Sequence, residues 1–131
     1  MNRQENLDTV KRLYAAFGTG DVHGLLGTLD ASIDWVTPGS APWSGEGRGH
    51  GHVQRFFEKF GTTASLKTFE PRSFVADGDT VVLMGYEEGT SRQTGREWKA
   101  HFTHVFTVGG GKITAHREYI DTQAIAEAFR T

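Results

Sequence analysis

The chain has 131 residues, of which 37% are hydrophobic and 23% are charged, and its 14 basic and 16 acidic residues give a formal net charge of −2. This length predicts one domain over residues 1–131 with an ordinary core. The charges are scattered along the chain and form no basic stripe, so we expect no nucleic-acid partner. The absence of cysteine excludes disulfides, thiolate nucleophiles and cysteine-based zinc sites. The polar start MNRQENLDTV and the lack of a membrane-length apolar run predict a cytoplasmic protein that binds no membrane.

The first half of the chain predicts helices around one short strand. Apolar residues recur at helical spacing from Gln4 to Phe17, which indicates an amphipathic helix. Asp21 suits the N-cap of a short second helix. Ser32 to Val36 predicts a strand, and the Gly-, Pro- and Ser-rich segment from Thr37 to Gly51 predicts a long loop. A third helix follows, with apolar residues between Val53 and Phe60.

The second half predicts a β-meander. Strands are expected at Leu66–Val75, Thr80–Thr90, Glu97–Val108 and Lys112–Ile120, because β-rich runs alternate there with Gly-containing turns. The two middle strands are much longer than the usual five or six residues, so they must bend strongly. A closing helix follows, with Asp121 or Thr122 as its N-cap. This order predicts an α+β fold in which a strongly curved, mainly antiparallel sheet wraps around the N-terminal helices.

Four parts of the sequence carry a resemblance to a known family: Gly20-Asp21, Asp34-Trp35, the helix entry from Gly49 to Phe57, and the ending GKITAHREYID. Together they resemble the SnoaL-like proteins of the nuclear transport factor 2 superfamily, which also includes ketosteroid isomerase and limonene epoxide hydrolase. The resemblance implies a cone-shaped barrel, a homodimer formed through the outer sheet face, and a pocket for a small apolar or aromatic molecule. It specifies no reaction, because this scaffold hosts several chemistries and some proteins with none.

His116 and Glu118 lie two residues apart on the last predicted strand and therefore point the same way. Alternation alone predicts that Ile113, Ala115 and Tyr119 are buried and that the His–Glu pair is solvated. The resemblance implies the opposite, because matching the preceding turn to the family's ending places both side chains in the cavity. In limonene epoxide hydrolase, the position that matches Glu118 carries a catalytic aspartate.

The resemblance also implies an orientation for the preceding strand. On that basis His101 and Thr103 face the pocket, whereas Phe102, His104 and Phe106 turn outward.

Five other residues are assigned a place in or near the pocket, from the resemblance or from their position in the predicted elements. Trp35 is expected to form a pocket wall, and it stands where ketosteroid isomerase has its catalytic base, so that mechanism is not expected here. Glu87 is expected to face inward, and Phe56 belongs to the helix that covers the pocket. Trp43 either closes over a ligand or packs on its own loop. Trp98 is expected to face outward as a dimer contact.

Glu118, His101 and His116 form the predicted catalytic group, with Glu118 as the base and either histidine as a proton donor or orienting partner. The alternative is a polar cluster on an open sheet face, or a buried pair whose members merely satisfy each other. For Tyr14, a hydroxyl at the cavity floor and simple core packing both remain open.

Two functions follow from these assignments. The first is an acid–base enzyme of the cyclase, isomerase or hydrolase type, which needs no cofactor or metal and acts on a small apolar or cyclic substrate. The second is a non-catalytic ligand-binding or accessory protein on the same scaffold. A third possibility is an interaction module whose cavity is vestigial.

Overall fold

The computed structural model describes residues 2–131. Its elements follow in the order α1 (Arg3–Gly18), α2 (Val22–Leu26), β1 (Leu29–Thr37), β2 (Gly45–Arg48), α3 (His50–Thr63), β3 (Ala64–Asp77), β4 (Thr80–Ser91), β5 (Glu97–Gly109), β6 (Lys112–Ile120) and α4 (Thr122–Phe129). The predicted α+β fold is confirmed. None of the helices within residues 2–131 has the length and apolarity needed to cross a membrane.

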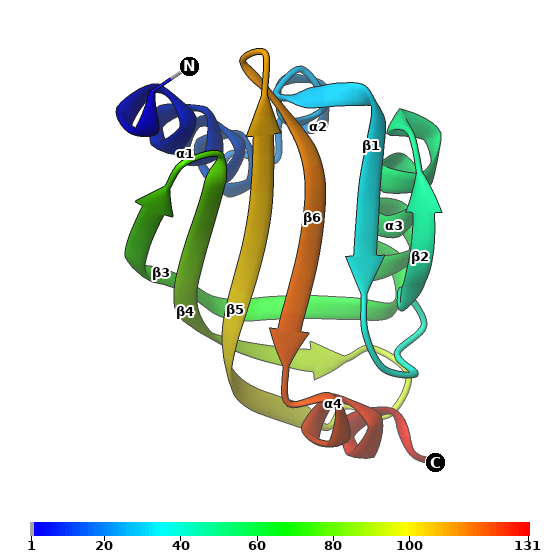
Figure 1. Cartoon of the computed structure of the whole chain (residues 1–131). Helices are drawn as coiled ribbons and strands as arrows, with labels where there is room; N and C mark the ends of the chain where they lie inside the picture. The colour runs from blue at the N-terminus through cyan, green and yellow to red at the C-terminus, as the bar shows by residue number, and fades with distance from the viewer. Residues whose placement is uncertain (1) are drawn as a thin grey trace.

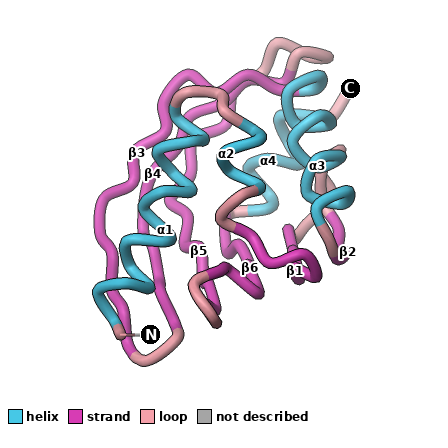
Figure 2. The backbone as a smooth tube through the Cα atoms, turned by 90° about the horizontal axis from the view of Figure 1, so that it is seen from above, coloured by secondary structure: helices cyan, strands magenta, loops and turns pink. Residues whose placement is uncertain are grey.

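The strands form one curved sheet in the order β2-β1-β6-β5-β4-β3. All neighbours pair antiparallel except β1 and β6, which are parallel. The sheet does not close into a barrel, because β2 and β3 remain as its two edges. Helices α1, α2 and α3 cover its concave face, and α4 lies across the lower end against β4 and β5 (Figures 1 and 2). The interior of the molecule thus lies between the sheet and the helices.

The starts of α1, α2 and α4 are capped by side chains. Asn2 accepts a hydrogen bond from the backbone N–H of Glu5 at the start of α1. Asp21 and Asp121 cap α2 and α4 in the same way, so Asp121 rather than Thr122 is the N-cap of the last helix. These caps satisfy backbone donors that the first helical turn leaves free.

A β-bulge changes which residues of β6 face inward. Val108 lies opposite Ile113, but Thr107 lies opposite Ala115, so Thr114 is an extra residue on β6. An extra residue reverses the alternation of side chains beyond it. Residues three apart across the bulge therefore share a face. As a result, Ile113 before the bulge and His116 and Glu118 after it all point into the interior.

One predicted loop contains a strand. The segment from Thr37 to Gly51 includes β2, which pairs antiparallel with β1 from Asp34 opposite Arg48 to Thr37 opposite Gly45. The glycine content indicated a loop, but pairing with β1 overrides that local preference.

The interior contains two apolar clusters. The larger one lies between α1, α3 and the sheet and includes Val10, Leu13 and Phe106. The smaller one lies at the α4 end and includes Trp43 and Trp98. Trp98 is only 2% exposed, so the prediction that it faces outward is wrong. The candidate site lies where these clusters meet.

Candidate functional site

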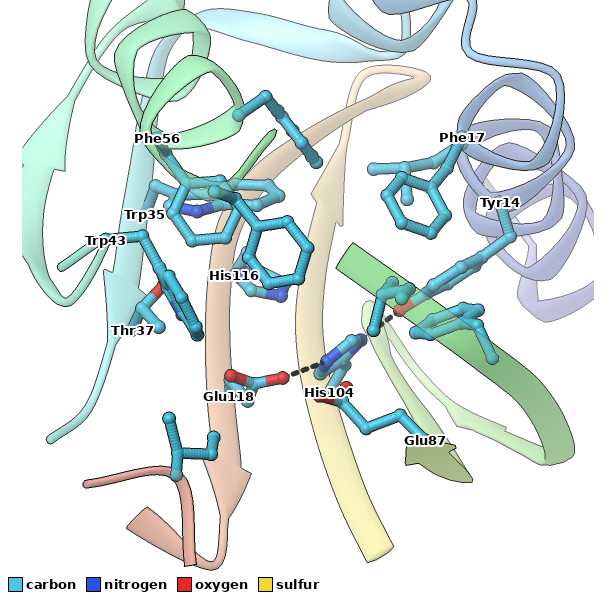
Figure 3. A pocket seen from close by; sticks show the side chains of 16 residues that line it. Tyr14, Phe17, Trp35, Thr37, Trp43, Phe56, Glu87, His104, His116 and Glu118 are labelled. Carbon is cyan, nitrogen blue, oxygen red and sulfur yellow. Dashed lines mark hydrogen bonds and ion pairs between the residues drawn. The ribbon is translucent and has the colours of Figure 1, made fainter. Parts of the chain in front are cut away.

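A cavity opens between the concave face of the sheet and the helices. The atom-free space in and around it, including open solvent at the mouth, is about 640 Å³. Half of its sixteen lining residues are aromatic, namely Tyr14, Phe17, Trp35, Trp43, Phe56, Phe57, Phe60 and Phe69. The polar residues are Thr37, Glu87, His104, His116 and Glu118, and no lysine or arginine contributes to the lining (Figure 3). The cavity therefore suits a largely apolar molecule that meets a few polar groups.

The side chains of Tyr14, His104 and Glu118 form a hydrogen-bonded chain in the cavity (Figure 3). His104 and Glu118 lie directly opposite each other on β5 and β6, and His104 Nε2 is 2.7 Å from Glu118 Oε2. The other ring nitrogen, Nδ1, is hydrogen-bonded to the hydroxyl of Tyr14 on α1. Because the His104 and Glu118 side chains are only 10% and 13% exposed, this pair is largely shielded from water.

The state of Tyr14 determines which atoms donate in the hydrogen-bonded chain Tyr14–His104–Glu118. Burial and, to a lesser extent, the charge of Glu118 raise the pKa of Tyr14 well above its usual value, so its hydroxyl keeps its proton. We assign the Tyr14 hydroxyl as the donor to Nδ1 of His104, which leaves the ring proton on Nε2 to be donated to the Glu118 carboxylate. His104 thereby holds Glu118 through one oxygen and leaves the other available to a ligand.

His116 is a second buried histidine, 5% exposed, and it lies flat against the indole of Trp35 with their ring centroids 3.9 Å apart. Burial and the nearby His104 hold the pKa of His116 well below its usual value, so the ring is neutral. Its Nδ1 has no hydrogen-bond partner within the described residues, and the same is true of Trp35 Nε1 and Thr37 Oγ1.

Glu87 is a second acidic group of the cavity and is 6% exposed. Its Oε2 accepts a hydrogen bond of 2.9 Å from Trp98 Nε1. Burial and the charge of Glu118 raise the pKa of Glu87 to about 7, against the opposing effect of the Trp98 N–H. The cavity therefore contains one carboxyl group that is bound to a histidine and another that titrates near neutral pH.

Six of the eight residues that the sequence assigned to a site line this cavity: Trp35, Trp43, Phe56, Glu87, His116 and Glu118. His101 and Thr103 do not. They lie on the outer face, because it is Phe102, His104 and Phe106 that turn inward. The orientation that the resemblance implied for this strand is wrong by one residue.

His104 and Thr37 are polar lining residues that the sequence assigned to no site, and for Tyr14 the structure favours the cavity hydroxyl over simple core packing. The signal for His104 is the apolar alternation of β5, in which Trp98, Phe102 and Phe106 are all buried and share its face. Tyr14 carries no such signal, because a helix-face tyrosine has the same pattern whether its hydroxyl meets a partner or not.

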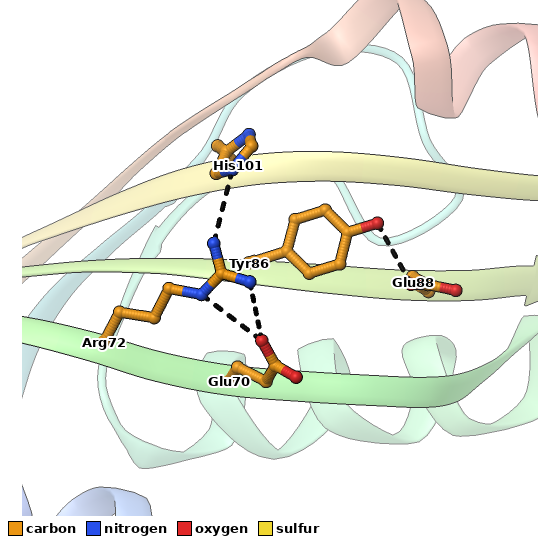
Figure 4. A network of polar contacts seen from close by, with 5 residues as sticks. All are labelled: Glu70, Arg72, Tyr86, Glu88 and His101. Atoms are coloured by element: carbon orange, nitrogen blue, oxygen red, sulfur yellow. Dashed lines mark hydrogen bonds and ion pairs between the residues drawn. The ribbon is translucent and has the colours of Figure 1, made fainter.

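His101 instead belongs to a polar cluster on the outer sheet face (Figure 4). Arg72 lies 4.9 Å from the centre of the Tyr86 ring, 2.7 Å from Glu70 and 3.5 Å from His101 Nε2. The Arg72 and Glu70 side chains are each half exposed, so this ion pair contributes little to stability.

Comparison with known proteins fits this geometry. A family model of the SnoaL-like domain matches residues 10–116. The chain belongs to the SnoaL-like family. This SnoaL-like chain is 37% identical to an NTF2-like protein from Burkholderia xenovorans LB400, with a TM-score of 0.92 over 99% of both chains. It is 29% identical to TerC, which was co-crystallised with polyporic acid, with a TM-score of 0.85 over 95% of this chain and 97% of TerC. An uncharacterized protein of Mycobacterium tuberculosis (strain ATCC 25618 / H37Rv) is 28% identical over 98% of each chain.

Proposed function

We propose that this SnoaL-like protein binds a small, largely apolar ring compound and catalyses proton transfer on it. The observation that carries this proposal is the Tyr14–His104–Glu118 hydrogen-bonded chain inside a cavity lined mainly by apolar side chains, many of them aromatic. The similarity to TerC, which was co-crystallised with polyporic acid, supports a small organic molecule as the ligand.

Glu118 is the proposed catalytic base. One of its oxygens is held by His104, and the other faces the cavity, so it can take a proton from a bound carbon acid. When the same carboxyl group returns the proton to a different atom, the ligand is isomerised or cyclised. His104 and Tyr14 are positioning residues in this scheme, since they orient the carboxylate rather than touch the reacting atoms.

The test uses 2-tetralone, a two-ring carbon acid, and follows deuterium incorporation next to its carbonyl group in D₂O by NMR. We expect the wild-type protein to accelerate the exchange and Glu118→Gln to lower the protein-catalysed rate by about a hundredfold or more, which is the usual contribution of a general base. His101→Ala is the matched control, because this histidine lies on the outer face and should leave the rate unchanged.

An undiminished rate in Glu118→Gln would remove Glu118 from its assigned role. Saturable binding of 2-tetralone without any acceleration of exchange would instead favour the non-catalytic alternative, a ligand-binding or accessory protein.

A further inference from the structure

Glu87 is the acidic side chain of the cavity that the proposed function leaves unused. It lies on the sheet side together with Glu118 and is only 6% exposed (Figure 3). Trp98 Nε1 donates to its Oε2, whereas Oε1 has no hydrogen-bond partner within residues 2–131 and keeps some accessible surface. Glu118 likewise has Oε2 held by His104 and Oε1 without a partner. Two carboxyl oxygens of the cavity are therefore open to a ligand.

No cationic side chain among the described lining residues balances these two carboxyl groups. The lining contains neither lysine nor arginine. Burial and the nearby His104 hold the pKa of His116 well below its usual value, so that ring is neutral, and the His104 ring is neutral in the hydrogen-bond arrangement assigned above. Buried carboxylates are normally paired with positive charge, because desolvation disfavours the ionised form. A ligand that donates a hydrogen bond and carries a positive charge satisfies both needs of Glu87.

Aromatic rings lie beside Glu87 at the α4 end of the cavity. The ring centre of Trp98, which donates to Glu87, is 5.8 Å from that of Trp43, and Trp43 is 4.6 Å from Phe60. Trp43 and Phe60 both line the cavity. The face of an aromatic ring has a negative electrostatic potential and attracts cations, most strongly in tryptophan. A carboxyl oxygen among such rings suits a protonated amine and repels an anion.

We propose that the Glu87 carboxylate and the Trp43 ring form an ammonium-binding subsite, and that the substrate is a cyclic compound with a protonated amine. This inference rests on the proposed function and names its substrate class. The ammonium group donates to Glu87 Oε1, and the apolar ring of the substrate fills the cavity beside Glu118. Glu87 determines specificity and takes no part in the proton transfer. An uncharged hydroxyl group would meet Oε1 without balancing the charge.

The first experiment compares 2-aminotetralin, which is positively charged at neutral pH, with 2-methyltetralin, in which a methyl group replaces the ammonium group. Their Kd values are measured by quenching of tryptophan fluorescence at pH 8. We expect the wild-type protein to prefer the amine and Glu87→Gln to reduce this preference roughly 10- to 100-fold, because a charge-assisted hydrogen bond is lost. The amide still accepts from Trp98. Glu88→Gln, on the outer face, is the matched control and should keep the wild-type preference.

The second experiment is made on the wild-type protein. A bound cation favours the ionised form of Glu87 and so lowers its pKa from about 7. At pH 7, binding of 2-aminotetralin should therefore release up to about half a proton, measured from the calorimetric binding heat in buffers of different ionisation enthalpy. 2-Methyltetralin should release none. Tyr14, His104, His116 and Glu118 also line the cavity, so loss of the release in Glu87→Gln assigns the proton to Glu87.

Four results would overturn the subsite. They are the absence of saturable 2-aminotetralin binding to the wild-type protein, equal wild-type affinity for the amine and for 2-methyltetralin, a preference for the amine that Glu87→Gln retains in full, and amine binding without proton release at pH 7. Tighter binding of 2-tetralol than of 2-aminotetralin would also overturn it, in favour of an uncharged hydrogen-bond donor.

The deuterium-exchange rate of 2-tetralone separates this inference from the proposed function. If Glu118→Gln lowers the exchange rate while Glu87→Gln leaves the preference for the amine unchanged, the catalytic role stands and the ammonium subsite fails. If the preference falls as expected but no exchange is catalysed, the subsite stands on a protein that only binds its ligand.

Discussion

Glu87 and His116 are buried residues of the cavity whose charged forms are disfavoured, but they affect stability in opposite directions. The raised pKa of Glu87 means that the folded protein holds a proton that the unfolded chain releases. The lowered pKa of His116 means that, just below the ordinary histidine pKa, His116 binds a proton in the unfolded chain but not in the folded protein. Substitution of each residue separates the two contributions.

For Glu87, stability should fall as the pH rises from about 4.5 to about 7, because the unfolded carboxyl group ionises over this window and the folded one does not. At about 1.4 kcal/mol per pH unit, the full loss is about 3 kcal/mol. Glu87→Gln cannot ionise, so its advantage over the wild type should grow by about this amount between pH 4.5 and pH 8 in urea unfolding. Glu88→Gln, on the outer face, is the control and should not show this growth. Parallel pH profiles for wild type and Glu87→Gln would contradict the assignment.

For His116, stability should be greatest above the ordinary histidine pKa of about 6.5 and fall as the pH drops below it. His116→Phe keeps a ring against Trp35 but cannot take up a proton. Its free energy of unfolding, relative to the wild type, should therefore be higher at pH 5 than at pH 8. His101→Phe supplies the comparison on the outer face, and an equal response from both variants would count against a buried neutral His116.

At the scale of elements, the sequence predicts the strands well and their orientation only in part. The regular apolar alternation of β5 contains the correct orientation, yet matching Thr103 to a family position reversed it. On β6, in contrast, the family resemblance gives the correct orientation and the alternation does not. Alternation from Ile113 misplaces His116 and Glu118, because the extra residue Thr114 reverses the pattern. A bulge is set by pairing with the neighbouring strand, so no pattern within β6 alone reveals it.

Two glycines of β4 let aromatic rings lie against the strand. A Cβ atom at Gly89 would lie 2.3 Å from the Trp98 ring, and one at Gly85 would lie 2.5 Å from the Phe102 ring. Trp98 in turn donates to Glu87, so this close approach helps to position an acidic group of the cavity.

Gly89→Ala should therefore destabilise the protein by about 1–3 kcal/mol, the usual cost of overpacking a buried site. Gly61→Ala is the matched control, because this glycine lies within α3 and an added Cβ meets no atom within 4 Å. It should instead stabilise the protein by about 0.5–1 kcal/mol. Urea unfolding measures both, and a Gly89→Ala variant as stable as the wild type would contradict the packing described for Trp98.

At the scale of the whole molecule, the outer sheet face carries apolar side chains that no helix covers. Met84 and Tyr119 are 41% and 56% exposed and flank Thr103 in one row across β4, β5 and β6. The neighbouring row contains Val82 and Val105. The polar cluster around Arg72 borders this surface (Figure 4).

We expect this face to form the homodimer, since an apolar centre with a polar rim is the usual anatomy of such an interface. Sedimentation equilibrium should give twice the monomer mass for the wild type, and Met84→Glu should shift it toward the monomer by burying a charge. Val22→Glu changes an exposed valine on α2, away from the sheet, and should leave the dimer intact. A monomeric wild type at micromolar concentration would contradict this expectation.

The pairing of β1 with β6 determines the order in which the molecule can be completed. Trp35 lies level with His116, but most of the chain separates the two residues. During synthesis, the β1 side of the cavity has no neighbouring strand until β6 has emerged from the ribosome. Contacts between such distant segments also form slowly, because a long loop must close before they contribute. A nascent chain interrupted before β6 would therefore expose its aromatic residues to water, and we expect such chains to be recognised by chaperones or to aggregate.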